Sequence, residues 1–324
     1  MKRREFITLF GSAALVQPVA ARAQLTAPTI GFLYEGLPEP LPLMAAFRQG
    51  LLEAGIDDAS GVAFENRWAE GQYDRLPALA IELRDKGVRI IAAAYLVAAL
   101  AAKAATQTVP IVFVTGSDPV AAGLVSSLNR PTGNLTGVAF MFTRLGPKNL
   151  AMLHQLVPKA IVIGVLVNPN NPNAGPQLRD LETAARALAL QLVILPAKTA
   201  QEVDHQFATL PERHIQALLV SADGFFFGLQ DQIVKLAARY RTPTVYPLSD
   251  YTAAGGLISY GANRSDAFRR TGFYVGRVLG GVRPTDLPVL QAARFDLVIN
   301  LKTSNALGLT VPPTLLTLAD EVIE

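Results

Sequence analysis

The chain has 324 residues, of which 50% are hydrophobic and 17% are charged, so it is long enough for two domains with large cores and is not expected to be disordered. It contains no cysteine, which excludes disulfides, thiolate zinc sites, iron–sulfur clusters, a cysteine nucleophile and a lipoprotein anchor. Its 29 basic and 26 acidic residues give a formal net charge of +3.

Residues 1–24 are predicted to be an export signal and not part of the fold. A basic start, Lys2–Arg4, precedes an apolar stretch, Phe6–Val16, that is too short to span a bilayer. The arginine pair in that basic start is typical of the twin-arginine route, and Ala21–Ala23 has the small-residue pattern of a cleavage site. We therefore expect cleavage near Ala23 and a periplasmic location. The alternative is a basic N-terminus that stays uncleaved as an anchor.

The excess positive charge belongs to this leader. It holds four of the basic residues and one of the acidic ones, so the rest of the chain has 25 of each and a formal charge of zero. Bulk attraction to nucleic acid loses its support, and we predict no nucleic-acid partner. No later apolar run approaches the roughly 18 residues that a membrane-spanning helix needs, so the exported protein is expected to be soluble.

From Thr29 onward, short apolar strands alternate regularly with helices, which indicates doubly wound parallel sheets. In the first half, strands are predicted at 29–34, 62–68, 89–94, 111–114 and 135–140, with helices at 43–54, 73–86 and 96–106. A second array follows, with strands at 161–167, 192–195, 217–221, 244–246, 257–260 and 295–301, and helices within 141–158 and at 177–190, 202–210, 229–240, 267–279, 302–307 and 315–322.

Two arrays of similar size predict an α/β protein with two Rossmann-like lobes, parallel sheets, and a ligand cleft between the lobes. We assign residues 27–140 plus 249–284 to the first lobe and 141–248 plus 285–324 to the second. No Ser/Gly-rich tether separates the halves, so short crossings, the first near 140–144, are expected to act as hinges that close the lobes on a ligand.

The stretch 109–128 illustrates how this pattern would build a binding site. Ile111–Val114 is an unbroken apolar run, as expected for a strand buried on both faces. Thr115–Pro119 then interrupts it with good helix-capping residues, and residues 121–128 are predicted to continue as a helix. The loop would lie at the carboxyl end of a parallel strand, where open α/β sheets bind ligands.

Polar and aromatic side chains follow several other predicted strands in the same way. Aromatic faces suit the apolar part of a small organic acid or amino acid, while helix amides and hydroxyls suit its carboxylate. An acidic side chain such as Asp118 or Asp223 could hold an ammonium group. The predicted ligand-binding residues are Tyr34, Glu35, Tyr95, Thr115, Ser117, Asp118, Asn168, Asp223, Phe225, Tyr246 and Tyr260.

Most of these residues also have a purely structural explanation. Ser117 and Asp118 are good helix caps, Asn168 is typical of turns, and aromatic residues such as Phe225 are common in cores. Only their placement in the fold separates the two explanations.

The sequence offers little for catalysis. It contains no G-x-S-x-G, G-x-x-x-x-G-K-[ST], G-x-G-x-x-G or H-E-x-x-H motif. Its histidines, His154, His205 and His214, are scattered, and Glu202 with His205 forms a single E-x-x-H pair where di-metal sites use two. We therefore expect no catalytic residue, no metal and no cofactor. The alternatives are an exported α/β hydrolase and a receptor that feeds a membrane sensor.

Several segments taken together resemble the bacterial ABC-transporter substrate-binding proteins of the tryptophan/tyrosine type. They are Ser117–Val120 with Ala122–Val125, Arg130–Val138, Asn168–Pro172, Phe225–Phe227, Ala254–Gly261, Phe295–Thr303 and Ala319–Glu324. The resemblance implies a type I periplasmic-binding-protein fold with a small-molecule ligand. It also implies an ABC permease and an ATPase in the inner membrane as partners, and we expect a monomer.

One segment departs from the family pattern. The family's third strand typically ends in a Gly-Thr/Ser-Pro segment whose hydroxyl meets the ligand, whereas this chain has Ala94–Val97 there, with Tyr95 in place of a small hydroxyl donor. We therefore expect a small aromatic or carboxylated solute that is amino-acid-like without having to be an amino acid.

Overall fold

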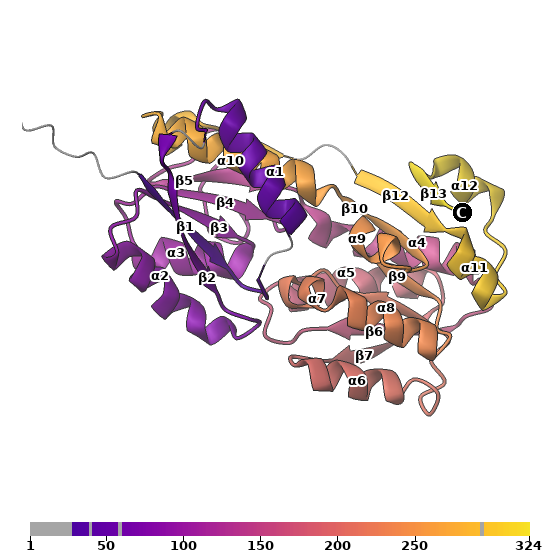
Figure 1. Cartoon of the computed structure of the whole chain (residues 1–324). Coiled ribbons are helices and arrows are strands. Elements are labelled where there is room, and N and C mark those ends of the chain that lie inside the picture. Colours follow the sequence, from indigo (N-terminus) through magenta and orange to yellow (C-terminus); the bar gives the residue numbers. More distant parts are fainter. Residues whose placement is uncertain (1–27, 39–40, 58–59, 292–294) are drawn as a thin grey trace, which may run out of the picture.

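The computed structural model describes residues 28–38, 41–57, 60–291 and 295–324. They form two α/β lobes, each a largely parallel sheet with helices on both faces, which confirms the predicted fold class (Figure 1). The export signal predicted for residues 1–24 lies outside the described residues. Among the helices that are described, none is long and apolar enough to cross a membrane.

The first lobe is built on a six-stranded parallel sheet in the order β11-β5-β4-β3-β1-β2. Its elements are β1 (Thr29–Tyr34), α1 (Leu41–Glu53), β2 (Ala63–Trp68), η2 (Tyr73–Arg75), α2 (Leu76–Asp85), β3 (Ile90–Ala94), α3 (Leu96–Ala105), β4 (Ile111–Thr115), β5 (Leu135–Ala139), α10 (Arg264–Leu279), η4 (Pro284–Asp286) and β11 (Leu290–Gln291). Helices α1 and α10 cover one face, and α2 and α3 cover the other (Figure 1). Every residue of β3 and β4 is therefore buried, which explains their unbroken apolar sequences.

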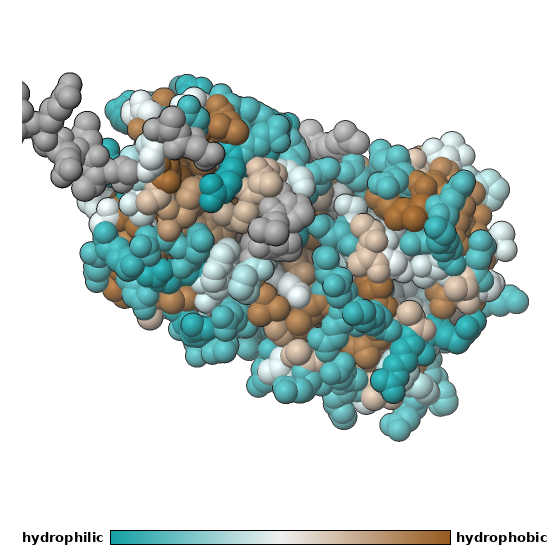
Figure 2. All heavy atoms as spheres, in the orientation of Figure 1, coloured by the Kyte–Doolittle hydropathy of each residue, from teal (hydrophilic) through white to brown (hydrophobic). Residues whose placement is uncertain are grey.

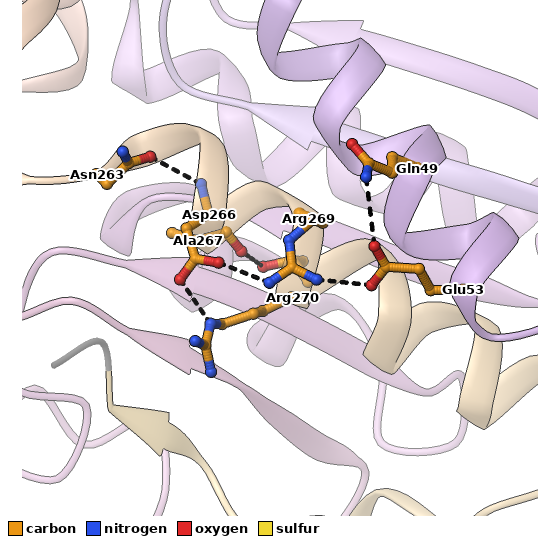
Figure 3. Close-up of polar contacts among 8 residues, drawn as sticks. Gln49, Glu53, Asn263, Asp266, Ala267, Arg269 and Arg270 are labelled. Carbon is orange, nitrogen blue, oxygen red and sulfur yellow. Dashed lines mark hydrogen bonds and ion pairs between the residues drawn. The ribbon is translucent and has the colours of Figure 1, made fainter. Parts of the chain in front are cut away.

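Helix α10 returns to the first lobe from the second half of the chain and packs closely on α1. The backbones approach so nearly that a Cβ on Gly50 would lie 1.8 Å from the Arg269 carbonyl oxygen. A Cβ on Gly272 would lie 1.9 Å from the Phe47 carbonyl oxygen. Outside this contact, Arg269 pairs with Glu53 at 2.6 Å (Figure 3). Because partly exposed ion pairs contribute little, this pair adds little to the α1–α10 contact, whose closeness depends on the two glycines.

The second lobe is built on a seven-stranded sheet in the order β13-β12-β10-β9-β8-β6-β7. Its elements are η3 (Phe142–Leu145), α4 (Gly146–Leu156), β6 (Val162–Val167), α5 (Ala174–Ala187), β7 (Gln191–Pro196), α6 (Ala200–Ala208), β8 (Ala217–Val220), α7 (Gly224–Gly228), α8 (Gln230–Arg239), β9 (Thr244–Tyr246), α9 (Ser249–Ala253), β10 (Ile258–Ala262), β12 (Phe295–Asn300), α11 (Leu301–Leu307), α12 (Pro313–Leu318) and β13 (Glu321–Ile323). Strands β6 to β10 repeat the order of β1 to β5, and β12 then pairs antiparallel with β10.

The chain passes between the lobes three times: after β5, at Asn263 between β10 and α10, and between β11 and β12. Two segments differ from the predicted boundaries. Residues 249–262, predicted for the first lobe, hold α9 and β10, and β10 pairs with β9 and β12 of the second sheet. Strand β11, predicted for the second lobe, pairs with β5 of the first. A two-residue strand is too short to show a periodic pattern, so the sequence did not reveal it.

Two predicted helical segments are wrong. Residues 121–128 form turns and bends because Gly123, at φ 70°, ends the short hydrogen-bonded turn that begins at Asp118. At the C-terminus, α12 ends at Leu318, and residues 321–323 instead pair with β12 as β13. In the second case the free edge of β12 decides the local conformation, since strand formation depends strongly on an available partner.

The apolar core does not stop at the lobe boundary. The buried cluster that fills the first lobe continues into the second through Phe225–Phe227 of α7 and through Tyr251. The outer surface is largely hydrophilic in the view of Figure 2, with an apolar area on the lobe that holds the C-terminus. The two lobes are thus in direct contact through buried side chains.

Candidate functional site

Both sheets reverse their strand order at one point, between β1 and β3 in the first lobe and between β6 and β8 in the second. In open α/β sheets, the crevice outside the carboxyl ends of the strands at such a point is the usual ligand site. Glu35 follows β1, Tyr95 follows β3, Asn168 follows β6, and Asp223 comes three residues after β8. The fold therefore brings these four predicted residues to the two crevices.

Asp223 is the centre of a buried hydrogen-bond network that joins the lobes. Its carboxylate accepts five hydrogen bonds, from the backbone amides of Phe225 (2.9 Å) and Phe226 (3.3 Å), the side-chain amides of Asn168 (3.3 Å) and Asn171 (2.6 Å), and the hydroxyl of Tyr73 (3.1 Å). The two backbone bonds make Asp223 the N-cap of α7. Tyr73 lies in η2 of the first lobe, so its bond to Asp223 crosses the cleft. Burial raises the pKa of Asp223, and the side-chain hydrogen bonds partly offset that shift.

Glu35 reaches the same region from the first lobe and is only 3% exposed. Its Oε2 accepts a hydrogen bond from the Val97 amide in the first turn of α3 at 3.1 Å, and its carboxylate also accepts one from the Gly224 amide at the start of α7. One carboxylate thus joins the N-terminal turns of a helix from each lobe. Burial raises the pKa of Glu35 well above its usual range, and the nearby charge of Asp223 raises it further.

Tyr95 lies between these groups in a strained conformation. Its φ of 71° and ψ of 173° fall in a region used almost only by glycine, at a typical cost of about 1–3 kcal/mol. Its ring packs against Tyr34 and Phe227, with centroids 5.4 and 5.5 Å away, and its hydroxyl accepts a hydrogen bond from Arg264 at 3.1 Å. Backbone strain that persists in this way is typical of functional sites.

Two cavities lie along the cleft. The inner one has a volume of about 10 Å³, and its walls include Glu35, Tyr95, Asn171, Asp223 and Phe227. The outer one, about 330 Å³, lies at the mouth of the cleft, and its walls include Leu96, Leu100, Asp118, Arg144, Pro172 and Pro176. Leu96, Ser117 and Asn173 line both, so the small polar cavity is the inner end of the larger, more apolar one. The inner volume is about that of one water molecule.

The end of β4 and the loop that follows it contribute three of the predicted residues. Thr115 Oγ1 accepts a hydrogen bond from the Ser117 amide at 3.1 Å, which places Ser117 against both cavities. Asp118 Oδ1 accepts hydrogen bonds from the amides two and three residues later, as a capping residue does, while Oδ2 pairs with Arg144 of the second lobe at 2.8 Å. Asp118 therefore stabilises the turn and also forms part of the cleft mouth.

The other predicted residues line neither cavity; they are Tyr34, Thr115, Asn168, Phe225, Tyr246 and Tyr260. Tyr34 supports the ring of Tyr95, and Phe225 belongs to the α7 cap. Tyr246 is stacked on Tyr251 with ring centroids 4.9 Å apart, and the Tyr260 ring carries the Lys148 ammonium 3.9 Å from its centroid. The contacts of Tyr246 and Tyr260 are therefore with other side chains of the second lobe.

Sequence reasoning missed three residues of the site: Tyr73, Asn171 and Arg264. Tyr73 precedes α2 and is not at a strand end, so its position carried no signal. Asn171 lies in the same Asn-rich turn as Asn168. Arg264, 4% exposed, contacts Tyr95, the Phe227 ring and Asp250 at the crossing into α10. An arginine in the first turn of a helix opposes the helix dipole, and that placement is a usable signal.

The contacts offered by this site are those of recognition: two carboxylates, three side-chain amides or hydroxyls, and aromatic walls. Over the described part of the chain, no group of three or more His, Asp or Glu side chains is placed to hold a metal ion.

Comparison with known proteins identifies the group to which the chain belongs. Residues 41–323 match the family model described as ABC transporter substrate binding protein, and the chain belongs to that family. A curated relative, the tyrosine-binding protein of Clostridioides difficile strain R20291, is 26% identical over 263 residues, which cover 81% of this chain and 75% of the relative.

Solved structures share the whole fold. A domain from Streptococcus pneumonia in complex with L-Trp superposes with a TM-score of 0.79 at 24% identity, covering 91% of this chain and 99% of the other. The ligand-free, open structure of a substrate-binding protein with adhesive properties from Clostridium difficile gives a TM-score of 0.61 at 25% identity, covering 92% and 99%.

Proposed function

We propose that this chain is the solute receptor of an ABC importer and that it holds a small amino-acid-like solute, aromatic or carboxylated, between its lobes. The observation that carries the proposal is the meeting of the two switch-point crevices. Glu35 and Tyr95 from one lobe and Asp223 from the other line the inner cavity, which shares three lining residues with the 330 Å³ cavity. Small-molecule sites typically start at about 300 Å³ and combine apolar walls with a few placed polar groups.

The nature of the solute is proposed from the walls and from the relatives. Leu96, Leu100, Pro172 and Pro176 offer an apolar surface for a ring or a short hydrocarbon body, and the polar groups gather at one end. The names of the relatives refer to tyrosine and L-Trp, which supports a solute of similar size. Tyr95 leaves less room at the inner end than a small hydroxyl residue would.

The proposed working cycle depends on the three crossings. Rotation there would separate Tyr73 from Asp223 and Glu35 from the Gly224 amide, which opens the inner cavity to solute. Closure would restore these bonds over the solute, and a membrane permease with its ATPase would recognise the closed form. We further propose that residues 1–24 direct the protein to the periplasm, that the lobes perform no covalent chemistry, and that the receptor acts as a monomer.

A thermal-shift screen of the purified protein against amino acids, aromatic acids, amines, sugars and nucleosides tests the receptor proposal. A solute present at about 100 times its dissociation constant should add about 2.7 kcal/mol to the unfolding free energy, which is readily detected. Binding at this site is then tested with Asp223→Ala and Tyr73→Phe, which should weaken it, and with Asp286→Asn, an exposed control far from the cleft. Failure of every class of solute to stabilise the protein would refute a receptor role.

A further inference from the structure

The N-terminal turn of α3, which would be the natural place for a solute carboxylate, is already occupied by a carboxylate of the protein. Glu35 Oε2 accepts from the Val97 amide at 3.1 Å, and the same side chain accepts from the Gly224 amide at the start of α7. The fit leaves no spare room, since a Cβ on Gly224 would lie 2.3 Å from Glu35 Oε1. A solute carboxylate at this point would have to displace Glu35 or lie against it.

The closed cleft also carries an excess of buried negative charge. Glu35 and Asp223 are 3% and 2% exposed, and the charge of Asp223 raises the energetic cost of ionising Glu35. Within the described part of the chain, no lysine or arginine forms an ion pair with either of them. Burying unpaired charges is costly, so a positive group placed between these carboxylates would lower the free energy of the closed form.

The shape of the cleft indicates where that positive group would go. The inner cavity of about 10 Å³ lies against both carboxylates and also against Asn171 and Ser117. A primary ammonium group is close to a water molecule in size and needs hydrogen-bond acceptors, which Glu35 and Ser117 offer, while Asp223, which already accepts five hydrogen bonds, contributes its charge. The outer cavity of about 330 Å³ continues from it through Leu96 and Ser117, and it would hold the rest of the solute.

We propose that the solute is a primary amine that carries no carboxylate beside its ammonium group, and that Glu35 is the residue that sets this specificity. The inference rests on the receptor function proposed above. It narrows the class of solute from an aromatic or carboxylated molecule to an aromatic or apolar amine. Glu35 takes the place of the carboxylate that an amino acid would bring, because it accepts hydrogen bonds from the helix amides and adds a negative charge to the inner cavity. An α-amino acid would add a second negative group to the same confined space.

Matched pairs of probes that differ in one group provide the test. Isothermal titration calorimetry at pH 7 compares tyramine with tyrosine, tryptamine with tryptophan, and phenethylamine with phenylalanine, and tyrosine methyl ester separates the effect of charge from that of size. We expect each amine to bind at least tenfold more tightly than its amino acid, with the ester closer to the amine. In Glu35→Gln the amine should lose at least tenfold in affinity, whereas Glu35→Asp keeps the charge and should keep the preference. Asp286→Asn is the control.

The possible outcomes separate this inference from the receptor proposal. Amino acids binding as tightly as their amines, or amines binding Glu35→Gln as well as the unchanged protein, would overturn the inference and leave the receptor function standing. The same holds if only sugars or nucleosides bind. No binding by any class would refute the receptor function itself. If Glu35→Gln does not fold, the matched pairs on the unchanged protein still decide the matter.

Discussion

Replacing Asp223 by alanine tests whether the network across the cleft holds the lobes together. The substitution removes the acceptor of five hydrogen bonds. Loss of the two bonds to the α7 amides should cost about 1 kcal/mol, as for other N-caps. The donors on Tyr73, Asn168 and Asn171 would lose their acceptor, at about 1–3 kcal/mol for each that stays buried. Asn168 can still bond to Tyr73, and a buried charge disappears, so we expect a net loss of about 3–5 kcal/mol.

Urea denaturation measures this loss, with the single tryptophan as the reporter. Trp68 packs on Tyr34, with ring centroids 5.7 Å apart, close to the cleft. Asp223→Asn keeps an N-cap oxygen and should lose only about 1–2 kcal/mol. Asp118→Ala is the control for a lost cap, because Asp118 also accepts two backbone amides; it removes the exposed pair with Arg144 as well, which contributes little, so it should lose about 1 kcal/mol. If Asp223→Ala cost no more than Asp118→Ala, the network would not be what closes the lobes.

Three further predictions concern the charge of Glu35, the α1–α10 contact and the leader. The raised pKa of Glu35 means that the carboxyl group holds its proton more tightly in the folded protein than in the unfolded chain. Burial of Glu35 therefore destabilises the folded protein increasingly as the pH rises from the unfolded pKa toward the folded pKa. Glu35→Gln should therefore melt at a higher temperature than the unchanged protein at pH 7.5, with the difference shrinking toward pH 4; a pH-independent difference would contradict this. Gly272→Ala should lower the free energy of unfolding in urea by about 1–3 kcal/mol, because its Cβ would meet the Phe47 carbonyl oxygen at 1.9 Å. Gly280→Ala should be nearly neutral, because the nearest contact of its Cβ would be at 3.4 Å. A reporter fused to residues 1–24 should be exported, and changing Arg3 and Arg4 to lysine should stop that export; export that survives would point to another route.

Much of the fold could be predicted from the sequence because it depends on local periodicity. Buried runs such as IIAAA in β3 and IVFVT in β4 identify central parallel strands, and their alternation with helices identifies the doubly wound sheets. What could not be predicted depends on partners distant in the chain. Strand β13 forms because the edge of β12 is free, and β11 forms because β5 offers an edge to a two-residue segment.

The same division holds for the site. The strand-end rule placed Glu35, Tyr95, Asn168 and Asp223 together, because carboxyl ends of parallel strands share one edge of a sheet. The rule also selected Tyr246 and Tyr260, whose rings pack elsewhere, since position at a strand end does not fix the direction of a side chain. The rule did not identify Tyr73 and Arg264, because each lies at the start of a helical segment and not at the end of a strand. No local pattern could reveal that the carboxylate at the α3 amides belongs to the protein.

The placement of one buried carboxylate in each lobe makes closure depend on what enters the cleft. In the open form that we propose, water would solvate Glu35 and Asp223 separately. Closure would bring the two like charges together and remove that water, while it would gain the Tyr73–Asp223 bond and the bond from Glu35 to the Gly224 amide. A solute shifts this equilibrium only by as much as it stabilises the closed form over the open one. A cation between the carboxylates removes the repulsion that exists only in the closed form, so it contributes directly to closure, whereas a neutral solute of the same shape contributes contacts alone.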